Sequence, residues 1–480
     1  MKKIKRVMLA YPNQRWQKFD LTTTWNLSPY ALCLLAAMLR DKYEVKIIDA
    51  QFYNLPLEKF REAVSEFRPD CVGLSLLTSE YAAALDMGAQ AVKQVSRDIT
   101  VIAGGVHVTT QYGRVMRNQS IDYCVRGEGE RVLRQLLDYL NAEGPLPGRG
   151  LVYRNAAGAV EALPPDLVAD LDSLPLPDYD LVDYPAYANT RPRYGVDASS
   201  VYPYARILTS RGCPVGCSFC QVKNISGRRW RRRSPGKIID ELSILRDRYG
   251  IRGFFIEDDN AFVDKERTKQ MLRLLRERDF GLKWKVPGVP FFGVDEEILD
   301  LMAQTGCQMI CLPVESGSRR ILEEIINKPV DLAAVPRVIK AAKARGIFVA
   351  ANFIIGFPGE TWDEIRQTIS YAEHCGADYC KIYAAQPLVG TQLYEIAKKM
   401  GCIVGDELSV NWRYGRIRSE HFSPKDISIL RVYEWDRINF SDPEKLKKTA
   451  GIMGISVEEL NRIRKETRDS LDFGNLCITA

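Results

Sequence analysis

Three cysteines with a short spacing are the residues of this sequence best suited to hold a metal. Cys213, Cys217 and Cys220 form a CxxxCxxC pattern, and the glycines and proline between and before them predict a loop that bends around a ligand. Thiolates are soft ligands that suit iron–sulfur clusters or zinc. Structural zinc and ordinary ferredoxin clusters take four protein ligands, and no fourth cysteine lies nearby in the sequence. A three-cysteine 4Fe–4S cluster would leave one iron open for a substrate or cofactor.

The elements that position this loop are expected to alternate between strands and helices. Strand-like apolar runs occur at residues 206–209, 253–257, 282–286, 309–314, 349–356 and 379–384. Helical patterns separate them at residues 235–249, 266–278, 296–305, 319–326, 333–345 and 362–375. Six βα units are too few for a closed eight-fold barrel, so the pattern predicts a partial (β/α)6 TIM-type barrel over residues 204–400. The active site of such a barrel lies at the carboxyl ends of its strands.

The sequence before the barrel predicts a separate domain of the α/β class. Apolar runs at residues 4–9, 45–49, 71–76, 100–103 and 123–125 alternate with helix-length segments such as 30–39, 57–67 and 82–95. This alternation indicates a doubly wound parallel sheet over residues 1–145, with ligands beyond the carboxyl ends of the strands. A linker rich in proline and tyrosine is expected at residues 146–203, and a small helical region at 401–480.

The composition is that of a globular protein with an unusual balance of metal-binding residues. Hydrophobic residues make up 46% of the 480 residues, and the net charge is only +6, from 67 basic and 61 acidic residues. This small excess does not argue for nucleic acid as a partner. The chain has 12 cysteines and 3 histidines, with no apolar run long enough for a membrane span and no signal peptide pattern. We therefore expect a cytoplasmic, thiol-reducing location, where cysteines serve metal binding or catalysis.

The cysteine motif resembles the signature of the radical S-adenosylmethionine (SAM) superfamily. That signature is CxxxCxΦC, where Φ is aromatic, and Phe219 occupies the aromatic position. The resemblance covers residues 206 to about 394. It implies that Cys213, Cys217 and Cys220 ligate a 4Fe–4S cluster, that SAM binds the open iron, and that Phe219 lies near the adenine.

Three further segments at successive predicted strand ends are similar to segments of this superfamily. Glu257-Asp258-Asp259-Asn260 resembles an acidic replacement of the segment that binds the SAM amino group. Glu315-Ser316-Gly317-Ser318 resembles the ribose-contacting segment, and residues 356–361 resemble the segment beside the adenine. The resemblance implies SAM contacts from Glu257, Asp258, Glu315, Ser316, Gly356 and Glu360.

A doubly wound domain before such a barrel resembles the cobalamin-binding subfamily. The segments at residues 25–32 and 104–109 are similar to recurring segments of that subfamily. The cobalamin contacts expected at the strand ends are Ser75, Thr78, Gly104, Gly105 and His107. The DxHxxG loop of the wider cobalamin family, whose histidine binds cobalt, would follow the first strand, but residues 12–16 contain no histidine. We therefore expect a lower cobalt face without histidine ligation.

The resemblance implies a cobalamin-dependent radical SAM enzyme. The leading hypothesis is methylation of an unactivated carbon through a 5′-deoxyadenosyl radical and methylcobalamin. An oxidative cyclase that uses the same cofactors, as in anaerobic chlorophyll synthesis, or another radical rearrangement with these cofactors stays an open alternative. A methylthiotransferase would need a second cluster, and Cys33, Cys71 and Cys124 lie in apolar helix or strand runs instead of loops. A cobalamin sensor or carrier is disfavoured by the intact cysteine triad.

The expected partners are a flavodoxin or ferredoxin as reductant and a small-molecule, peptide or lipid substrate. A dense basic run, Arg228-Arg229-Trp230-Arg231-Arg232-Arg233, follows the cysteine motif. One interpretation is a solvated lead-in to the next helix. The other is an anion site or a docking patch for an acidic reductant. Cys307 and Cys311 are interpreted as core thiols.

Overall fold

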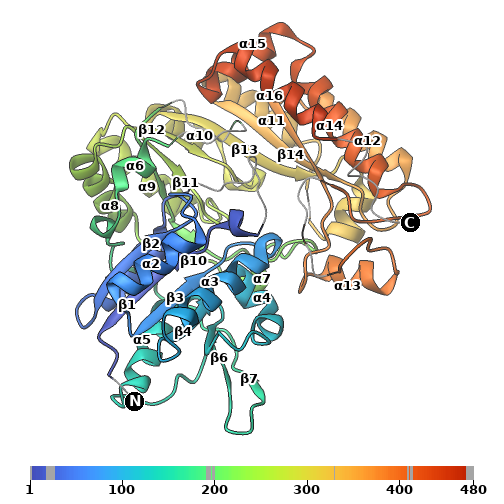
Figure 1. Ribbon diagram of the computed structural model, residues 1–480. Helices are drawn as coiled ribbons and strands as arrows, with labels where there is room; N and C mark the ends of the chain where they lie inside the picture. Colours follow the sequence, from blue (N-terminus) through green and yellow to red (C-terminus); the bar gives the residue numbers. More distant parts are fainter. Residues whose placement is uncertain are drawn as a thin grey trace. The chain divides into compact units, whose positions relative to one another are not determined.

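The computed structural model describes residues 3–17, 27–190, 196, 201–328, 330–407, 410 and 414–471. The chain divides into two compact units (Figure 1). The amino-terminal unit comprises Met1–Thr190 and Lys223–Gly227, and the carboxyl-terminal unit comprises Arg191–Val222 and Arg228–Ala480. In the described part of the chain, every helix is too short or too polar to cross a bilayer.

The amino-terminal unit is built on a seven-stranded sheet with the order β2-β1-β3-β4-β5-β6-β7. Strands β1 to β5 pair in parallel, and β6 and β7 add antiparallel strands at one edge. The order 2-1-3-4-5 is that of flavodoxin-like sheets, which bind ligands where the strand order reverses, between β1 and β3. The strands are Arg6–Tyr11, Glu44–Asp49, Cys71–Ser75, Thr100–Gly104, Tyr123–Val125, Leu151–Arg154 and Val160–Ala162.

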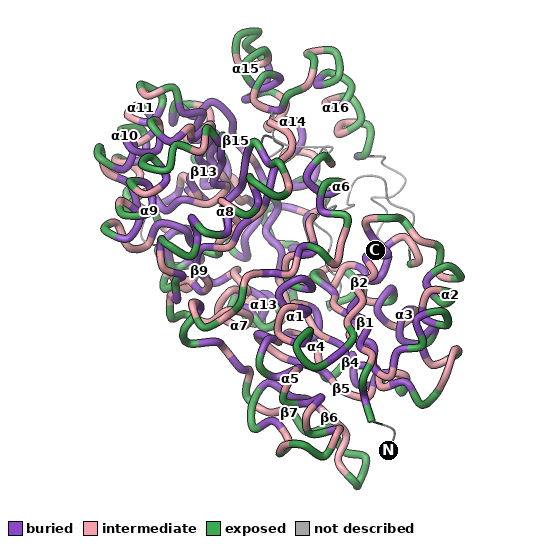
Figure 2. The backbone as a smooth tube through the Cα atoms, turned by 90° about the vertical axis from the view of Figure 1, so that its left-hand side faces the viewer, coloured by how far each residue is buried: buried purple, intermediate pink, exposed green. Residues whose placement is uncertain are grey.

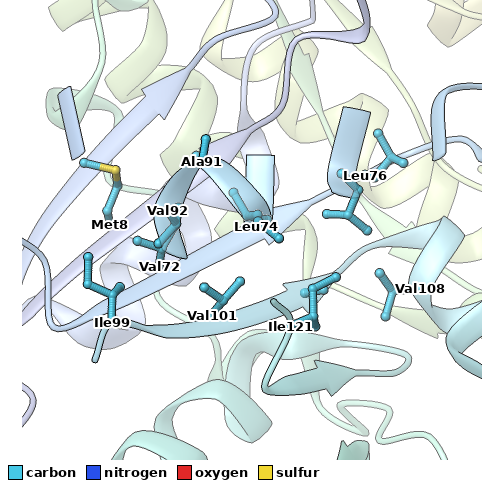
Figure 3. Close-up of a cluster of buried hydrophobic side chains, with 14 of the residues drawn as sticks. Met8, Val72, Leu74, Leu76, Ala91, Val92, Ile99, Val101, Val108 and Ile121 are labelled. Atoms are coloured by element: carbon cyan, nitrogen blue, oxygen red, sulfur yellow. The ribbon is translucent and has the colours of Figure 1, made fainter. Parts of the chain in front are cut away.

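Helices cover both faces of this sheet because alternate strand residues point to opposite sides. On one face, Met8 of β1, Leu74 of β3 and Val101 of β4 pack with Val92 of α3 (Figure 3). Helices α1 and α5 contact each other and take no part in this cluster, so they cover the other face. The helices are α1 Tyr30–Leu39, α2 Leu57–Phe67, α3 Ala82–Val95, α4 Val106–Val115 and α5 Gly129–Leu140.

Residues 146–190, expected to be part of a linker, fold with the amino-terminal unit. Strands β6 and β7 extend its sheet, and a short helix, α6 (Tyr184–Ala188), packs on its strand ends. The Tyr187 hydroxyl donates a hydrogen bond to Asp49 Oδ2 over 3.0 Å, and its ring stacks on Phe52 with centroids 3.8 Å apart. Strand β7 escaped the sequence analysis because it is fully exposed and has no apolar run, and β6 has only two buried residues.

The carboxyl-terminal unit has six parallel strands in chain order, β8-β11-β12-β13-β14-β15, with β8 and β15 at the edges. The strands are Tyr204–Ile207, Gly253–Ile256, Lys283–Val286, Cys307–Glu315, Phe348–Ile355 and Tyr379–Ala384. The helices between and after them are α8 Pro235–Tyr249, α9 Lys265–Arg278, α10 Glu296–Gln304, the π-helix Ile321–Ile326, α11 Val335–Ala344, α12 Trp362–His374 and α13 Gln392–Lys399. All six predicted βα units are present and their strands are mainly buried. Figure 2 shows this burial around β13 and β15.

The predicted helical region after residue 400 consists of α14 (Pro424–Phe440), α15 (Pro443–Met453) and α16 (Val457–Asp469). Phe440, Met453 and Leu460 from these helices form a buried cluster with Met309 of β13 and Phe348 of β14. Helix α14 also covers the edge strand β15. Its Asn439 side chain accepts from the backbone N–H of Cys380 over 2.7 Å and donates to the carbonyl oxygen of Cys380 over 2.8 Å. These helices therefore belong to the core of the unit.

Candidate active site

The cysteine loop, residues 212–221, follows β8 and the short strand β9 (Ser210–Arg211), and β9 pairs with β10 (Arg231–Arg232), which comes after the loop. Hydrogen bonds to the π-helix, to α13 and to Val389 hold it in place. Ser218 donates from its backbone to Ile326 at the end of the π-helix, Leu393 of α13 donates to Ser218, and the Gln221 side chain donates to Val389. The loop is therefore fixed on several sides at the carboxyl edge of the sheet.

The three motif cysteines differ from the other cysteines in exposure. Of the 11 described cysteines, Cys213, Cys217 and Cys220 are partly exposed and the other eight are buried. Burial raises the pKa of Cys217 to about 12 and that of Cys220 to about 11, so a bound cation must supply the charge that keeps both thiols deprotonated. Within the described ranges, no three His, Cys, Asp or Glu side chains converge on a single metal ion. A 4Fe–4S cluster does not need such convergence, because each thiolate binds a different iron.

The acidic segment after β11 binds the cysteine loop itself. Asp258 accepts hydrogen bonds from the Thr209 backbone (2.6 Å), the Thr209 hydroxyl (2.5 Å) and the Ser210 hydroxyl (2.6 Å). Asp259 accepts from the backbone N–H of Gly212 over 2.8 Å, and Glu257 pairs with Arg206. Burial raises the pKa of Asp258, although these hydrogen bonds oppose the shift. Asp259 therefore holds the cysteine loop and Asp258 holds the two residues before it. Glu257 pairs with β8, and the SAM contacts expected from Glu257 and Asp258 stay a prediction.

The segment after β13 is held by α12 and by a buried ion pair. The Ser316 hydroxyl lies 3.0 Å from the Thr368 hydroxyl, which also accepts from the backbone of Gly317. Glu315 has a positive φ of 74° and pairs with Lys328, whose Nζ lies 2.8 Å from Glu315 Oε1. Both side chains of this pair are about nine-tenths buried. Lys328 also lies near Cys217, so the pair borders the cysteine loop.

The segment after β14 packs against the aromatic residue of the cysteine motif. The Phe219 and Phe357 rings are tilted with centroids 6.3 Å apart. Glu360 is fully buried and accepts from the backbone N–H groups of Gly356 (2.6 Å) and Phe357 (2.9 Å). A Cβ on Gly356, whose φ is +84°, would lie 3.0 Å from two carbons of Ile427, so this glycine lets α14 pack closely.

Burial raises the pKa of Glu360 to about 8, and this predicts a pH dependence of stability. The folded state then binds a proton that the unfolded state releases between about pH 4.5 and 8, so stability falls as the pH rises through this range. Replacing Glu360 by Gln removes the titration and keeps one acceptor oxygen. When the pH is raised from 6 to 7, we expect the free energy of unfolding of the wild type to fall by about 1 kcal/mol more than that of Glu360→Gln. Denaturant unfolding at the two pH values measures both changes. Equal losses for both proteins would contradict this.

The arginine run matches neither simple interpretation in full. Arg231 and Arg233 are buried, and Arg233 pairs with Glu241 of α8 over 2.5 Å. Arg228, Arg229 and Arg232 are exposed. The Arg228 guanidinium lies against the cysteine loop, because a Cβ on Gly216 would be 3.0 Å from Arg228 Nη2. The run therefore combines two buried arginines with three exposed ones, of which Arg228 contacts the loop.

In the amino-terminal unit, the predicted strand-end residues lie in two adjoining turns. His107 Nδ1 lies 2.9 Å from the Ser79 hydroxyl, which also accepts from Gln111 Nε2. Burial lowers the pKa of His107 to about 4. Thr78 caps the short helix Ser79–Tyr81 by accepting from Glu80. The end of β3 at Ser75 and the segment after it thus join the end of β4 at Gly104, the turn residue Gly105 and the first turn of α4, which holds His107. Of the segment at residues 25–32, Trp25 and Asn26 lie outside the described residues.

Comparisons with known proteins assign the chain to a family. The radical SAM superfamily profile matches residues 207–372, and the B12 binding domain profile matches residues 22–137. The chain is 33% identical over 438 residues to the uncharacterized methyltransferase PH0819 of Pyrococcus horikoshii, covering 90% of this chain and 91% of that protein. This chain belongs to the cobalamin-binding radical SAM family. Its members use a 4Fe–4S cluster, SAM and cobalamin.

Other relatives and solved structures agree with this family. The chain is 29% identical over 456 residues to cytidylyl-2-hydroxyethylphosphonate methyltransferase of Streptomyces wedmorensis, covering 85% and 84% of the two chains. TsrM from Kitasatospora setae, solved with cobalamin and a [4Fe–4S] cluster, shares the fold with a TM-score of 0.70 at 18% identity, over 99% and 100% of the chains. The structure of OxsB, a cobalamin-dependent SAM radical enzyme, matches with a TM-score of 0.74 at 17% identity, covering 97% of this chain and 72% of OxsB.

The residues present fit the cofactors of the family. Three partly exposed thiols suit a cluster with one open iron. Near Phe357, the buried Oε1 of Glu360 has no hydrogen-bond partner among the described residues, so it is available to a ligand. In the amino-terminal unit, Gln14 Oε1 and Gln51 Nε2 are buried at the ends of β1 and β2, also without a partner in the described part. Cobalamin carries amide side chains around its ring, so unpartnered buried amides suit this ligand.

The two adjacent glycines after β4 give a matched test of the cobalamin site. A Cβ on Gly105, whose φ is +95°, would lie 2.6 Å from the Leu76 carbonyl oxygen, whereas no described atom lies within 4 Å of a Cβ on Gly104. We expect Gly105→Ala to lower the free energy of unfolding by about 2–4 kcal/mol. Gly104→Ala should cost less than about 1 kcal/mol. Denaturant unfolding measures both changes, and a Gly105→Ala variant of wild-type stability would contradict the clash.

Cobalamin titration followed by visible absorbance then tests the contact predicted at Gly104. If this open position faces the ligand, Gly104→Ala loses cobalamin affinity while it keeps its stability. Unchanged affinity would remove Gly104 from the site.

The methylthiotransferase alternative receives no support from the cysteines of the amino-terminal unit. Cys33, Cys71 and Cys124 are all buried, in α1, β3 and β5 respectively. Cys124 contacts the Met116 sulfur over 3.4 Å instead of facing a loop. Cys307 and Cys311 are buried in β13, as expected for core thiols.

Sequence reasoning missed three residues of these sites. Ser79 links His107 to Gln111, Lys328 pairs with Glu315, and Asn260 donates from Nδ2 to Cys213 Sγ over 3.4 Å. Asn260 lay within the acidic segment recognised in the sequence, so its position, although not its role, was visible. Lys328 carries no sequence signal.

Proposed function

We propose that this chain is a methyltransferase that places a methyl group on an unactivated carbon. The observation that carries the proposal is similarity over both units, 90% of the chain, to a protein named a methyltransferase. Cys213, Cys217 and Cys220 would hold the cluster, and the segments at Glu315–Ser316 and Gly356–Glu360 would hold SAM. When bound, the cofactors supply a 5′-deoxyadenosyl radical for hydrogen abstraction and a methyl group for transfer.

The residues of this chain would hold the reacting groups and limit access of water. Asp259 and the π-helix fix the cysteine loop and Asp258 fixes Thr209 before it, so these residues would hold a bound cluster in a set position. The segment at Ser316 is fixed by Thr368. The buried Phe357 ring stands beside Phe219 as an apolar wall. Rigid support of this kind would keep bound SAM and a substrate in a fixed geometry, which favours a reaction between them.

A second candidate is an oxidative cyclase. The chain is 27% identical over 382 residues to anaerobic magnesium-protoporphyrin IX monomethyl ester cyclase of Rubrivivax gelatinosus, covering 78% of this chain and 66% of that protein. The two reactions differ in one measurable product. A methyltransferase incorporates the SAM methyl group into its substrate, and a cyclase does not.

Incubation with deuteromethyl SAM distinguishes the two candidates. The reconstituted, cobalamin-loaded enzyme would be given a reductant, labelled SAM and a metabolite extract. We expect an enzyme-dependent product that carries three deuterium atoms, together with 5′-deoxyadenosine and S-adenosylhomocysteine. A product formed with 5′-deoxyadenosine but without the label would overturn the methyltransferase proposal. Release of no 5′-deoxyadenosine would favour the sensor or carrier.

The cobalt is proposed to lack a histidine ligand on its lower face. His107 is engaged with Ser79, and the turn after β1 presents Gln14 in place of a histidine. We therefore expect the electron paramagnetic resonance (EPR) spectrum of the cob(II)alamin form to lack nitrogen superhyperfine splitting. Such splitting from an axial imidazole would refute this.

The reductant is proposed to dock beside the cysteine loop. Arg229 and Arg232 are exposed next to Arg228, which contacts the loop, so this face suits an acidic flavodoxin or ferredoxin. Reversing both charges to Glu should slow turnover with flavodoxin but not with dithionite. The matched control reverses the exposed Arg462 of α16, which should leave both rates unchanged. Equal flavodoxin-driven rates in the wild type and the double variant would dismiss this surface.

A cytoplasmic location is also part of the proposal. Its support is that all 11 described cysteines are free thiols.

A further inference from the structure

Asn260 stands out among the polar residues around the cysteine loop. It lies four residues past the end of β11 and is only 6% exposed. Its Nδ2 lies 3.4 Å from Cys213 Sγ, within hydrogen-bond distance for a sulfur acceptor. Its Oδ1 is buried and has no partner in the described part of the chain. A buried amide with one contact to a motif sulfur and no other side-chain partner is a costly arrangement, and it calls for a functional reason.

The backbone of Asn260 is fixed from two sides. Its carbonyl oxygen accepts from Trp230 Nε1 over 2.9 Å and from the Ser210 hydroxyl over 3.3 Å. Trp230 lies under Arg267, whose guanidinium carbon is 5.5 Å from the indole centroid. Arg267 in turn donates to the backbone of Thr209, which precedes β9 and the cysteine loop. The amide is therefore held at a set distance from Cys213 by the same network that holds the loop.

The chemistry of the sulfur fixes the orientation of the amide. A thiolate bound to iron accepts hydrogen bonds and donates none, so the N–H of Asn260 must face Cys213. A hydrogen bond to a cluster sulfur stabilises the reduced state more than the oxidised state, because the reduced cluster carries more negative charge. The carboxylates nearby face the backbone of the loop. Among the described side chains, Asn260 makes the one hydrogen bond donated to Cys213.

We infer that Asn260 is a positioning residue that raises the reduction potential of the cluster through its hydrogen bond to Cys213. The inference rests on cluster ligation by Cys213, Cys217 and Cys220. It deepens the proposed function, because the potential decides whether a biological reductant can drive the cleavage of SAM.

The test is a redox titration of the reconstituted full-length protein, followed by the EPR signal of the reduced cluster without SAM. Asn260→Ala removes the donor. We expect at least a tenfold lower ratio of reduced to oxidised cluster at one ambient potential, which is a shift of about 59 mV to more negative potential for a one-electron couple. Iron content should stay at about four per chain. A fully loaded Asn260→Ala protein with the wild-type potential would overturn the inference.

Asn260→Asp keeps the shape of the side chain and tests the same hydrogen bond if the alanine variant loses iron. A carboxylate has no N–H and adds negative charge, so the potential should fall further than in the alanine variant. An unchanged potential in a loaded Asn260→Asp protein would also overturn the inference. The matched control is Asn352→Ala in β14, because Asn352 Oδ1 accepts from the Cys311 thiol, which lies outside the motif, over 3.1 Å. The reduction potential of the cluster in Asn352→Ala should equal that of the wild type.

The result separates this inference from the proposed function. A wild-type chain that takes up no iron would contradict cluster ligation itself. A loaded variant with an unshifted potential would contradict only the role of Asn260.

Discussion

Replacing any one of Cys213, Cys217 and Cys220 by Ala should abolish cluster binding and all formation of 5′-deoxyadenosine. The motif supplies three ligands, so two remaining thiols cannot hold a 4Fe–4S cluster that already has one open iron. Burial raises the pKa of Cys217 and Cys220, which makes these thiols poor ligands unless a complete cluster compensates their charge. Iron after reconstitution should fall from about four to below about one per chain. The brown cluster absorbance should disappear with it.

Cys307→Ala is the matched control for this loss. Cys307 is buried in β13 and its thiol contacts the carbonyl oxygen of Met309, so its removal costs only about 1 kcal/mol. This variant should keep its iron and its SAM cleavage. A triad variant that retained four irons per chain would show that another residue is the ligand.

Lys328→Met should lower the free energy of unfolding by about 3–5 kcal/mol, because it leaves the buried Glu315 without its cation. Only 8% of the Glu315 side chain is exposed, and Lys328 Nζ lies 2.8 Å from its Oε1. Denaturant unfolding followed by tryptophan fluorescence measures the effect, since Trp284 is buried in the same sheet.

A second variant separates the unpaired charge from lost packing. Glu315→Gln combined with Lys328→Met has no buried charge at this position and should recover most of the lost stability. A double variant as unstable as Lys328→Met alone would show that the lysine acts through packing. A single variant as stable as the wild type would contradict the ion pair.

The strands of both sheets were predictable because buried parallel strands are short, nearly continuous apolar runs. Residues 253–257 were expected as a strand, and β11 spans Gly253–Ile256. The cysteine loop was predictable for a different reason, since its ligands are adjacent in the sequence. The antiparallel strand β7 left no such signal because all its residues are exposed.

The partners of side chains depend on register, which the sequence does not contain. Ile256, the last residue of β11, pairs with Ile207, the last residue of β8. This register brings Asp258 next to Thr209, since each lies two residues past the end of its strand. From the sequence alone, an acidic loop at a strand end is equally consistent with a ligand contact. The partnership of Glu315 and Lys328 is hidden in the same way, because a π-helix separates the two residues.

The side chain of Asn439 offers the backbone of Cys380 the donor and the acceptor that a seventh strand would offer. A strand edge with free N–H and C=O groups is a template on which another chain can add. At Cys380 both groups of β15 are already satisfied from within the same molecule. Self-association by sheet extension is therefore closed at this position. It becomes available only when α14 detaches, so conditions that loosen this helix should be those under which the protein first aggregates.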